Sequence, residues 1–178
     1  WVSDPQRALS NNSVAYREKP EIGTFMEEWL SLYKSKSGER GIFNRDAAQK
    51  QIEHANKHRQ SMGEEYRLRE PDHEFGTNPC SEIILRDKEF CNLTEIVVRS
   101  DDTAESLERK VRLATILGTW QSTLTNFKYL SSEWERNCED ERLLGVSITG
   151  IMDCKLTNGK SKGLEELLTH LKTTAIKE

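Results

Sequence analysis

The sequence predicts an α/β fold, because short runs with strand character alternate along the chain with stretches of helical period. Two β-branched runs, at 82–86 and 94–100, precede a long amphipathic stretch at 100–124. An apolar run at 143–154 precedes a last amphipathic stretch at 161–178. At 178 residues the chain has the length of one large domain or of a piece of a larger protein.

Two further helices are predicted in the first third of the chain. Residues 21–35 repeat apolar side chains with the helical period, and Gly38 marks the end of the pattern. Those apolar residues are Ile22, Phe25, Met26, Trp29, Leu30 and Tyr33. Residues 44–63 form a polar second helix that ends near Gly63.

The stretch at 100–124 is the best marked of the predicted helices. Asp101 and Asp102 are its candidate N-caps. Its apolar stripe is expected to pack against a sheet. The stripe comprises Leu107, Val111, Ala114, Leu117, Trp120 and Leu124. The following run at 143–154 is apolar and β-branched enough for a buried strand.

Composition narrows the classes of partner. The chain is 35% hydrophobic and 31% charged, with a formal net charge of −4, so no basic surface is expected for nucleic acid or an anionic membrane. No apolar run approaches the roughly 18 residues that a membrane span needs, and the opening residues lack the regions of a signal peptide. A cytoplasmic location is therefore expected. The chain begins with Trp1 rather than Met, which suggests a piece of a longer protein.

Several weaker patterns favour ordinary structure over a site, and no metal ligand is assigned. The four cysteines, at 80, 91, 138 and 154, form no CxxC pair, which argues against a zinc ribbon or a thioredoxin motif. His54 and His58 lie four apart but lack the glutamate of HExxH, so a solvated surface is favoured. "GVSITG" misses the GxSxG spacing and is expected to be a buried strand. "KSKSGERGIFNR" misses the phosphate-loop pattern and is expected to be a charged surface loop.

The stretch "GTNPCSEIIL" at 76–85 is the main candidate for chemistry. Pro79 disfavours a helix and pushes the preceding residue towards extended dihedrals. In an extended chain, Asn78, Cys80 and Glu82 project to the same side, roughly 6 to 7 Å apart. The alternative is a loop leading into a strand, with Asn78 in a turn and Cys80 as a small buried hydrophobe.

The longer stretch at 76–99, "GTNPCSEIILRDKEFCNLTEIVVR", resembles ribonucleotide reductase, specifically the adenosylcobalamin-dependent class II enzymes. The family's Asn-x-Cys-x-Glu pattern falls on Asn78, Cys80 and Glu82, and its second cysteine, followed by Asn-Leu, falls on Cys91. Three more segments resemble the family in the family's order: "RALSNNSVAY", "SGERGIFNR" and "LLGVSITGIMD". The spacing of eleven between the two cysteines resembles class II, since class I enzymes usually carry a longer insert there.

The resemblance implies a fold and an activity for the whole enzyme. Residues 1–178 would be a single partial catalytic domain, an internal portion of the ten-stranded α/β barrel of the family, completed by segments on either side. The enzyme would reduce ribonucleotides to 2′-deoxyribonucleotides by thiyl-radical chemistry with adenosylcobalamin as cofactor. Its partners would be the ribonucleotide substrate, a thioredoxin-like reductant and the remainder of the reductase chain. This portion alone is expected to lack turnover.

The resemblance also implies a role for each site residue. Cys80 would be the thiyl that abstracts the 3′ hydrogen, and Glu82 would be the general base for the 3′-hydroxyl. Asn78 would position the ribose. Cys91 would be half of the reducing dithiol, and neither Cys138 nor Cys154 matches its family partner.

One departure and two alternatives accompany this interpretation. Ser81 stands where many relatives have glycine, a change that is expected to be neutral. The first alternative is a class I reductase that uses a separate radical-generating subunit. The second is a non-catalytic α/β module that carries thiols or binds a metal through Cys80, Cys91 and the His54/His58 pair.

Overall fold

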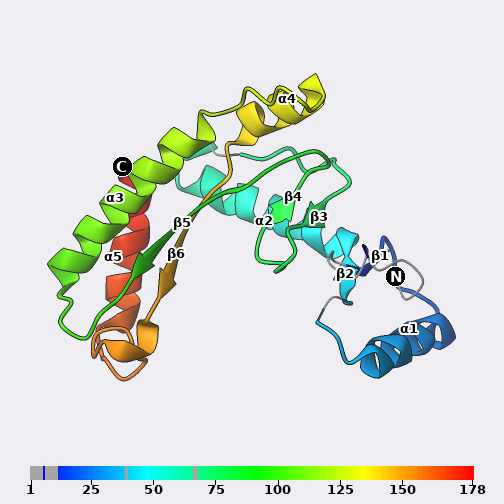
Figure 1. Cartoon of the computed structure of the whole chain (residues 1–178), viewed down its shortest axis with the longest axis horizontal. Coiled ribbons are helices and arrows are strands. Elements are labelled where there is room, and N and C mark those ends of the chain that lie inside the picture. Colours follow the sequence, from blue (N-terminus) through cyan, green and yellow to red (C-terminus); the bar gives the residue numbers. More distant parts are fainter. Residues whose placement is uncertain (1–5, 7–11, 39, 66–67) are drawn as a thin grey trace. The chain divides into compact units, whose positions relative to one another are not determined.

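The computed structural model describes residues 6, 12–38, 40–65 and 68–178 (Figure 1). The chain divides into two compact units, Trp1–Asp87 and Lys88–Glu178. The described strands pair as three two-stranded sheets, so the structure is mixed α/β and no sheet closes within the described residues. The assignment of 1–178 to a single partial domain of a ten-stranded barrel stays a prediction.

The first unit contains the two helices predicted from its sequence. Its elements are β1 (Val14–Tyr16), α1 (Ile22–Ser35), β2 (Ile42–Asn44), α2 (Arg45–Ser61), β3 (Gly76–Thr77) and β4 (Ile84–Leu85). β1 pairs with β2 in parallel, and the family-like segment at 7–16 ends in β1, although its residues 7–11 lie outside the described part. α2 begins after Asn44, whose Oδ1 accepts a hydrogen bond from Ala47 N at 2.9 Å.

The core of the first unit forms along α2. Ala48 and Ile52 of this helix are buried together with Phe75, and Phe43 and Ile84 pack against them. α1 has no buried residue among its apolar positions. The large apolar side chains that it exposes are Ile22, Met26, Trp29, Leu30 and Tyr33.

The second unit is a parallel β-α-β arrangement with an added helix. Its elements are β5 (Asn92–Val97), α3 (Ala104–Ser122), α4 (Ser132–Glu141), β6 (Leu144–Thr149), a 3-10 turn (Ile151–Asp153) and α5 (Leu164–Lys177). β5 and β6 pair in parallel, with Asn92 opposite Leu144 and Val97 opposite Thr149. The two strands and the helices α3 and α5 are confirmed. α4 was not predicted, because its sequence "SEWERNCEDE" is polar on most sides.

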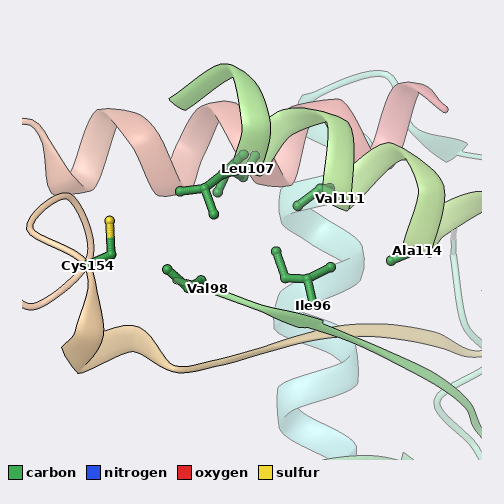
Figure 2. Packing of buried hydrophobic residues seen from close by; sticks show 7 residues of the cluster. Ile96, Val98, Leu107, Val111, Ala114 and Cys154 are labelled. Carbon is green, nitrogen blue, oxygen red and sulfur yellow. The ribbon is translucent and has the colours of Figure 1, made fainter. Parts of the chain in front are cut away.

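Helix α3 packs on the strands through only part of its predicted apolar stripe. Figure 2 shows Leu107, Val111 and Ala114 directed from α3 towards Ile96 and Val98 of the strand segment. Cys154 and Leu171 complete this buried cluster. The prediction was wrong for Leu117, Trp120 and Leu124, which are exposed. The reason is geometric: the packed side continues through Gly118, where an added Cβ would meet Leu144 Cδ1 at 2.2 Å.

The N-terminus of α3 also differs from the prediction. The N-cap is Thr103, which forms a capping box with Ser106, so neither Asp101 nor Asp102 is the cap. Asp102 instead accepts hydrogen bonds from Arg99 N at 2.7 Å, Ser106 Oγ at 2.6 Å and Lys110 Nζ at 2.5 Å. The bond from Lys110 and then that from Ser106 lower the pKa of the Asp102 carboxyl to about 2.

Within the described residues, no helix combines the length and the apolar character that crossing a bilayer requires.

Candidate active site

The candidate stretch folds as a tight hairpin rather than as an extended chain. β3 and β4 pair antiparallel, with Gly76 opposite Leu85 and Thr77 opposite Ile84. Residues 78–83 connect them, and Ser81 N donates to Asn78 O at 3.0 Å to close a β-turn that has Pro79 at its second position. The expected row of side chains on one face of a strand is therefore replaced by a loop, because proline at that position favours a turn as well as an extended chain.

Asn78 holds the loop together from inside. Its side chain is buried, and its Oδ1 accepts a hydrogen bond from Ile83 N at 3.0 Å. Its backbone N also donates to Ile83 O at 3.3 Å. Since both ends of the loop are tied through Asn78, the residues between them are pushed outwards, and Cys80 and Glu82 are both exposed at the tip.

The base of the hairpin is fastened to α2. Arg69 Nη2 donates to Ile84 O at 3.0 Å, and its guanidinium lies 5.5 Å from the centre of the buried Phe75 ring. Asn56 of α2 fixes this arginine: its Nδ2 donates to Arg69 O at 2.6 Å, and its Oδ1 accepts from Arg69 N at 3.0 Å. The exposed tip of the hairpin therefore extends from a base that hydrogen bonds hold to α2. Sequence reasoning missed both anchoring residues, because no spacing or motif marks them.

Ser81 carries the conformational cost of the turn. Its φ is 66°, in the left-handed region that favours glycine. The expectation that serine is neutral at this position is therefore corrected, because the turn needs a dihedral that a side chain with Cβ adopts at some cost.

Cys91 lies in the other compact unit, one residue before β5, and is half-buried. Side chains alternate along a strand, so Cys91 shares a face with Leu93 and Glu95, opposite to the face on which Ile96 enters the core. The register places Glu95 next to Ser147 of β6. The predicted approach of Cys91 to Cys80 joins residues of different units and stays a prediction.

The remaining two cysteines serve the packing of the second unit. Cys138 of α4 is buried, its Sγ accepts a hydrogen bond from Phe90 N at 3.3 Å, and burial raises the pKa of its thiol. Cys154 is buried in the core, with its Sγ 3.7 Å from Asp102 O. None of the four cysteines forms a disulfide within the part of the chain that the structure describes.

The structure confirms the surface position predicted for one weaker sequence pattern and corrects the predictions for two others. His54 and His58 are exposed on α2. Among the described residues, no three His, Cys, Asp or Glu side chains are grouped as metal ligands. "GVSITG" forms most of β6, but the prediction of a buried strand was wrong, because Val146 and Ile148 are only partly buried against the core and no residue of the strand is fully buried. The segment ends at Gly150, whose φ of 74° turns the chain close to Val98 O. The prediction of a charged surface loop at 34–45 was wrong, because the segment holds the end of α1, the strand β2 and the first residue of α2. Its residue 39 lies outside the described part, and its Arg40 forms a partly buried ion pair with Glu28.

Comparison with known proteins points to one kind of enzyme. The chain is 31% identical over 154 residues to the adenosylcobalamin-dependent ribonucleoside-triphosphate reductase of Lactobacillus acidophilus, covering 85% of this chain and 18% of that relative. It is 31% identical over 150 residues to the reductase of the same name from Lacticaseibacillus paracasei, and 30% identical over 154 residues to that from Lactobacillus helveticus. Each of these matches also covers 18% of the relative's length.

No family model matches the chain. No solved structure matches it either. The chain thus spans 18% of the length of the curated relatives that it resembles. The match to the first of them covers 85% of the chain itself.

Proposed function

We propose that the chain is the part of an adenosylcobalamin-dependent ribonucleoside-triphosphate reductase that carries the radical cysteine. The observation that carries this proposal is the hairpin loop with Cys80 and Glu82 exposed at its tip, in a chain whose relatives bear that name. A loop of this kind can place a thiol and a carboxylate against one small substrate. The names of the relatives favour a triphosphate substrate and a cobalamin over a separate radical-generating subunit.

The residues at the tip fit the cofactor that the relatives' names specify. A bulky cofactor requires a thiol that it can approach, and Cys80 is exposed. The radical must also form at a fixed position, and Asn78 and Arg69 hold the loop and its base. Adenosylcobalamin, when bound, supplies the radical through homolysis of its cobalt–carbon bond.

Cys80 and Glu82 carry out different steps in the first half of the reaction. The thiyl of Cys80 takes the hydrogen atom from C3′ of the ribose, so an S–H bond forms as the C3′–H bond breaks. Glu82 takes the proton of the 3′-hydroxyl, which eases departure of the neighbouring 2′-oxygen as water. Asn78 uses its Oδ1 to close the loop, so contact with the ribose falls to its NH2 group, which donates.

The second half of the reaction requires two electrons. Cys91 and a partner thiol supply them as they become a disulfide: one of their hydrogens goes to C2′, and the other leaves with the 2′-oxygen in the water formed. Glu82 returns its proton to the 3′-oxygen. Cys80 then returns its hydrogen atom to C3′. The overall change converts one ribonucleotide and one dithiol into one deoxyribonucleotide, one disulfide and one water.

Two cysteine variants test this assignment in the complete polypeptide that contains these residues, with adenosylcobalamin and a ribonucleoside triphosphate. Cys80→Ser should abolish substrate radical formation and product, because the serine O–H bond is too strong to yield the radical. Cys91→Ser should still permit hydrogen abstraction but not reduction, so cofactor and nucleotide break down in place of clean product. Electron paramagnetic resonance, cofactor absorbance and deoxynucleotide yield distinguish the two.

Cys138→Ala is the matched control, because this thiol is buried against Phe90 rather than exposed on the loop. It should keep turnover, with some loss of stability. Turnover by Cys80→Ser, or identical behaviour of the Cys80 and Cys91 variants, would reject the proposed division of roles.

A further inference from the structure

Helix α4 contacts the short segment of the second unit that leads into β5. The ring of Trp134 stacks on the ring of Phe90, with 4.5 Å between their centres and 27° between their planes. Glu133 Oε2 accepts a hydrogen bond from Lys88 Nζ at 2.5 Å. Cys138 Sγ accepts one from Phe90 N at 3.3 Å. Three residues of α4 therefore touch the segment directly before β5.

The Phe90 ring belongs to a small aromatic cluster apart from the main core of this unit. Phe90 is not a member of the buried cluster around α3, and it remains 44% exposed. Phe127 meets the Phe90 ring edge to face, with the centres 5.3 Å apart and the planes at 71°. Offset-stacked and edge-to-face contacts are both favoured arrangements of aromatic rings. The position of the Phe90 side chain therefore depends on Phe127 and Trp134.

Cys91 lies between two points at which the backbone is held. On its N-terminal side, Phe90 is held by the aromatic cluster and by α4. On its C-terminal side, Asn92 N and Asn92 Nδ2 both donate to Leu143 O, at 2.8 and 3.1 Å. Leu143 follows the end of α4 by two residues. One stretch of chain, from Trp134 to Leu143, therefore holds the residues on both sides of Cys91.

Among the contacts from α4, the ring of Trp134 contributes most to the position of Phe90. A thiol sulfur is a weak acceptor, so loss of the bond to Cys138 alone should leave the segment in place. Lys88 and Glu133 are 38% and 41% exposed, and ion pairs in contact with water contribute little. A large aromatic ring buries more surface than either of these contacts and has a preferred geometry.

We propose that Trp134 is a positioning residue for the reducing thiol of Cys91. Its ring holds Phe90 and, through Phe90, the backbone that carries the thiol. This inference rests on the proposed function, because it takes Cys91 as half of the reducing dithiol. A dithiol becomes a disulfide only when its two sulfurs meet, and small errors in placement slow such steps strongly. Without the ring, the substrate radical would form normally but would be reduced less often.

Two measurements on the complete polypeptide test the proposal. The first is the rate at which iodoacetamide alkylates Cys91 in the absence of cofactor and nucleotide, followed by peptide mass mapping, with the exposed Cys80 as internal reference. The second is the number of deoxynucleotides formed for each adenosylcobalamin destroyed, with the rate of cofactor cleavage followed by absorbance. The alkylation rate does not depend on turnover, so it reports on the position of the thiol alone.

Four variants are compared with the unchanged polypeptide. Trp134→Ala removes the ring, and Trp134→Leu removes it while keeping an apolar side chain, which guards against misfolding. Trp134→Phe keeps an aromatic ring and should rescue both measurements. Tyr129→Ala is the matched control, because this aromatic residue lies in the loop before α4 and is 98% exposed.

The expected result for Trp134→Ala and Trp134→Leu is selective. Cys91 should be alkylated several times faster relative to Cys80, because the half-buried thiol is no longer held in place. The deoxynucleotide yield for each cofactor destroyed should fall by about 10- to 100-fold, while the rate of cofactor cleavage stays unchanged. Trp134→Phe should recover most of the yield, and Tyr129→Ala should match the unchanged polypeptide.

Other outcomes separate this proposal from the proposed function. In an active polypeptide, a change in only one of the two measurements would overturn the positioning role. An equal fall in cofactor cleavage and product would also overturn it, because that pattern indicates general damage to the structure. If the unchanged polypeptide forms no deoxynucleotide, the reductase activity is rejected, and the alkylation rates still decide whether Trp134 holds Cys91.

Discussion

Ser81 sets the shape of the loop that presents Cys80. Its φ of 66° is accessible to glycine at little cost, whereas a residue with Cβ pays on the order of 1–2 kcal/mol there. Glycine loses more backbone entropy on folding, which offsets part of that gain. We therefore expect Ser81→Gly to raise the free energy of unfolding of the chain by roughly 0.5–1 kcal/mol.

Urea unfolding of the two chains measures this difference. Ser81→Ala is the matched control, because alanine keeps Cβ and should give no increase. A glycine variant less stable than the serine chain would show that the left-handed dihedral at this position carries no strain.

Substitutions at Glu82 test its proposed role as general base without changing the shape of the loop. Glu82→Gln keeps the size of the side chain and removes its basicity, so we expect kcat of the complete polypeptide to fall by about 10²- to 10⁴-fold while nucleotide binding is retained. Glu82→Asp keeps a carboxylate at a shorter reach and should retain more activity than the glutamine variant. Equal turnover of Glu82→Gln and the unchanged enzyme would remove Glu82 from the role of base.

Asp102 gives the second unit a pH-dependent contribution to stability. Its pKa is lowered from 3.8 to about 2 by Lys110 and Ser106, so the folded state favours the charged carboxylate. The contribution is fully present above the unfolded pKa and is lost as the pH falls from roughly 4 through about 2. We expect it to amount to about 1.5–3 kcal/mol, the size of a hydrogen bond to a charged group.

Urea unfolding at pH 6 and near pH 2 checks this expectation. Asp102→Asn should be less stable than the unchanged chain at pH 6, and the difference should shrink towards pH 2. The exposed neighbour Asp101 provides the control. The difference in unfolding free energy between Asp101→Asn and the unchanged chain should not shrink in this way as the pH falls. A difference between Asp102→Asn and the unchanged chain that stays constant with pH would reject the linkage.

At the scale of elements, helical period was the strongest signal in the sequence. It located α1, α3 and α5, because an amphipathic helix repeats its apolar side chains over several turns. The polar helix α2 was predicted without such a period, from its composition and the glycine that follows it. It failed for α4, whose ten residues are mostly charged or polar. It also assigned Leu117 to the packed side of α3, because period alone does not tell a core-facing stripe from a second apolar flank.

The hairpin of β3 and β4 shows a different limit. Its strands have two residues each, which is too short to show the alternation of apolar and polar residues that predicts a strand. The turn depends on one side-chain bond, from Ile83 N to Asn78 Oδ1, and on the left-handed Ser81. The candidate catalytic residues were predicted from the resemblance of the sequence to a family. The geometry of the loop could not be predicted, because it depends on contacts that secondary-structure propensity does not encode.

At the scale of the whole molecule, the predicted site would draw residues from both units. Cys80 and Glu82 belong to the first unit, and Cys91 belongs to the second. Local patterns can assign each residue to a turn or a strand, but the predicted approach of Cys91 to Cys80 would depend on how complete units pack, which local patterns do not encode.

The supply of electrons leads to a prediction for the 178-residue chain itself. In the proposed reaction, reduction needs a second thiol beside Cys91, but Cys138 and Cys154 are buried in packing roles and Cys80 would serve the radical step. We therefore expect these 178 residues, given adenosylcobalamin, a ribonucleoside triphosphate and dithiothreitol, to form no deoxynucleotide, whereas the complete polypeptide should form it catalytically. Chromatographic quantification of the product compares the two. Repeated turnover by the 178-residue chain would mean that its own cysteines complete the dithiol, which would overturn the assignment of Cys138 and Cys154 to packing alone.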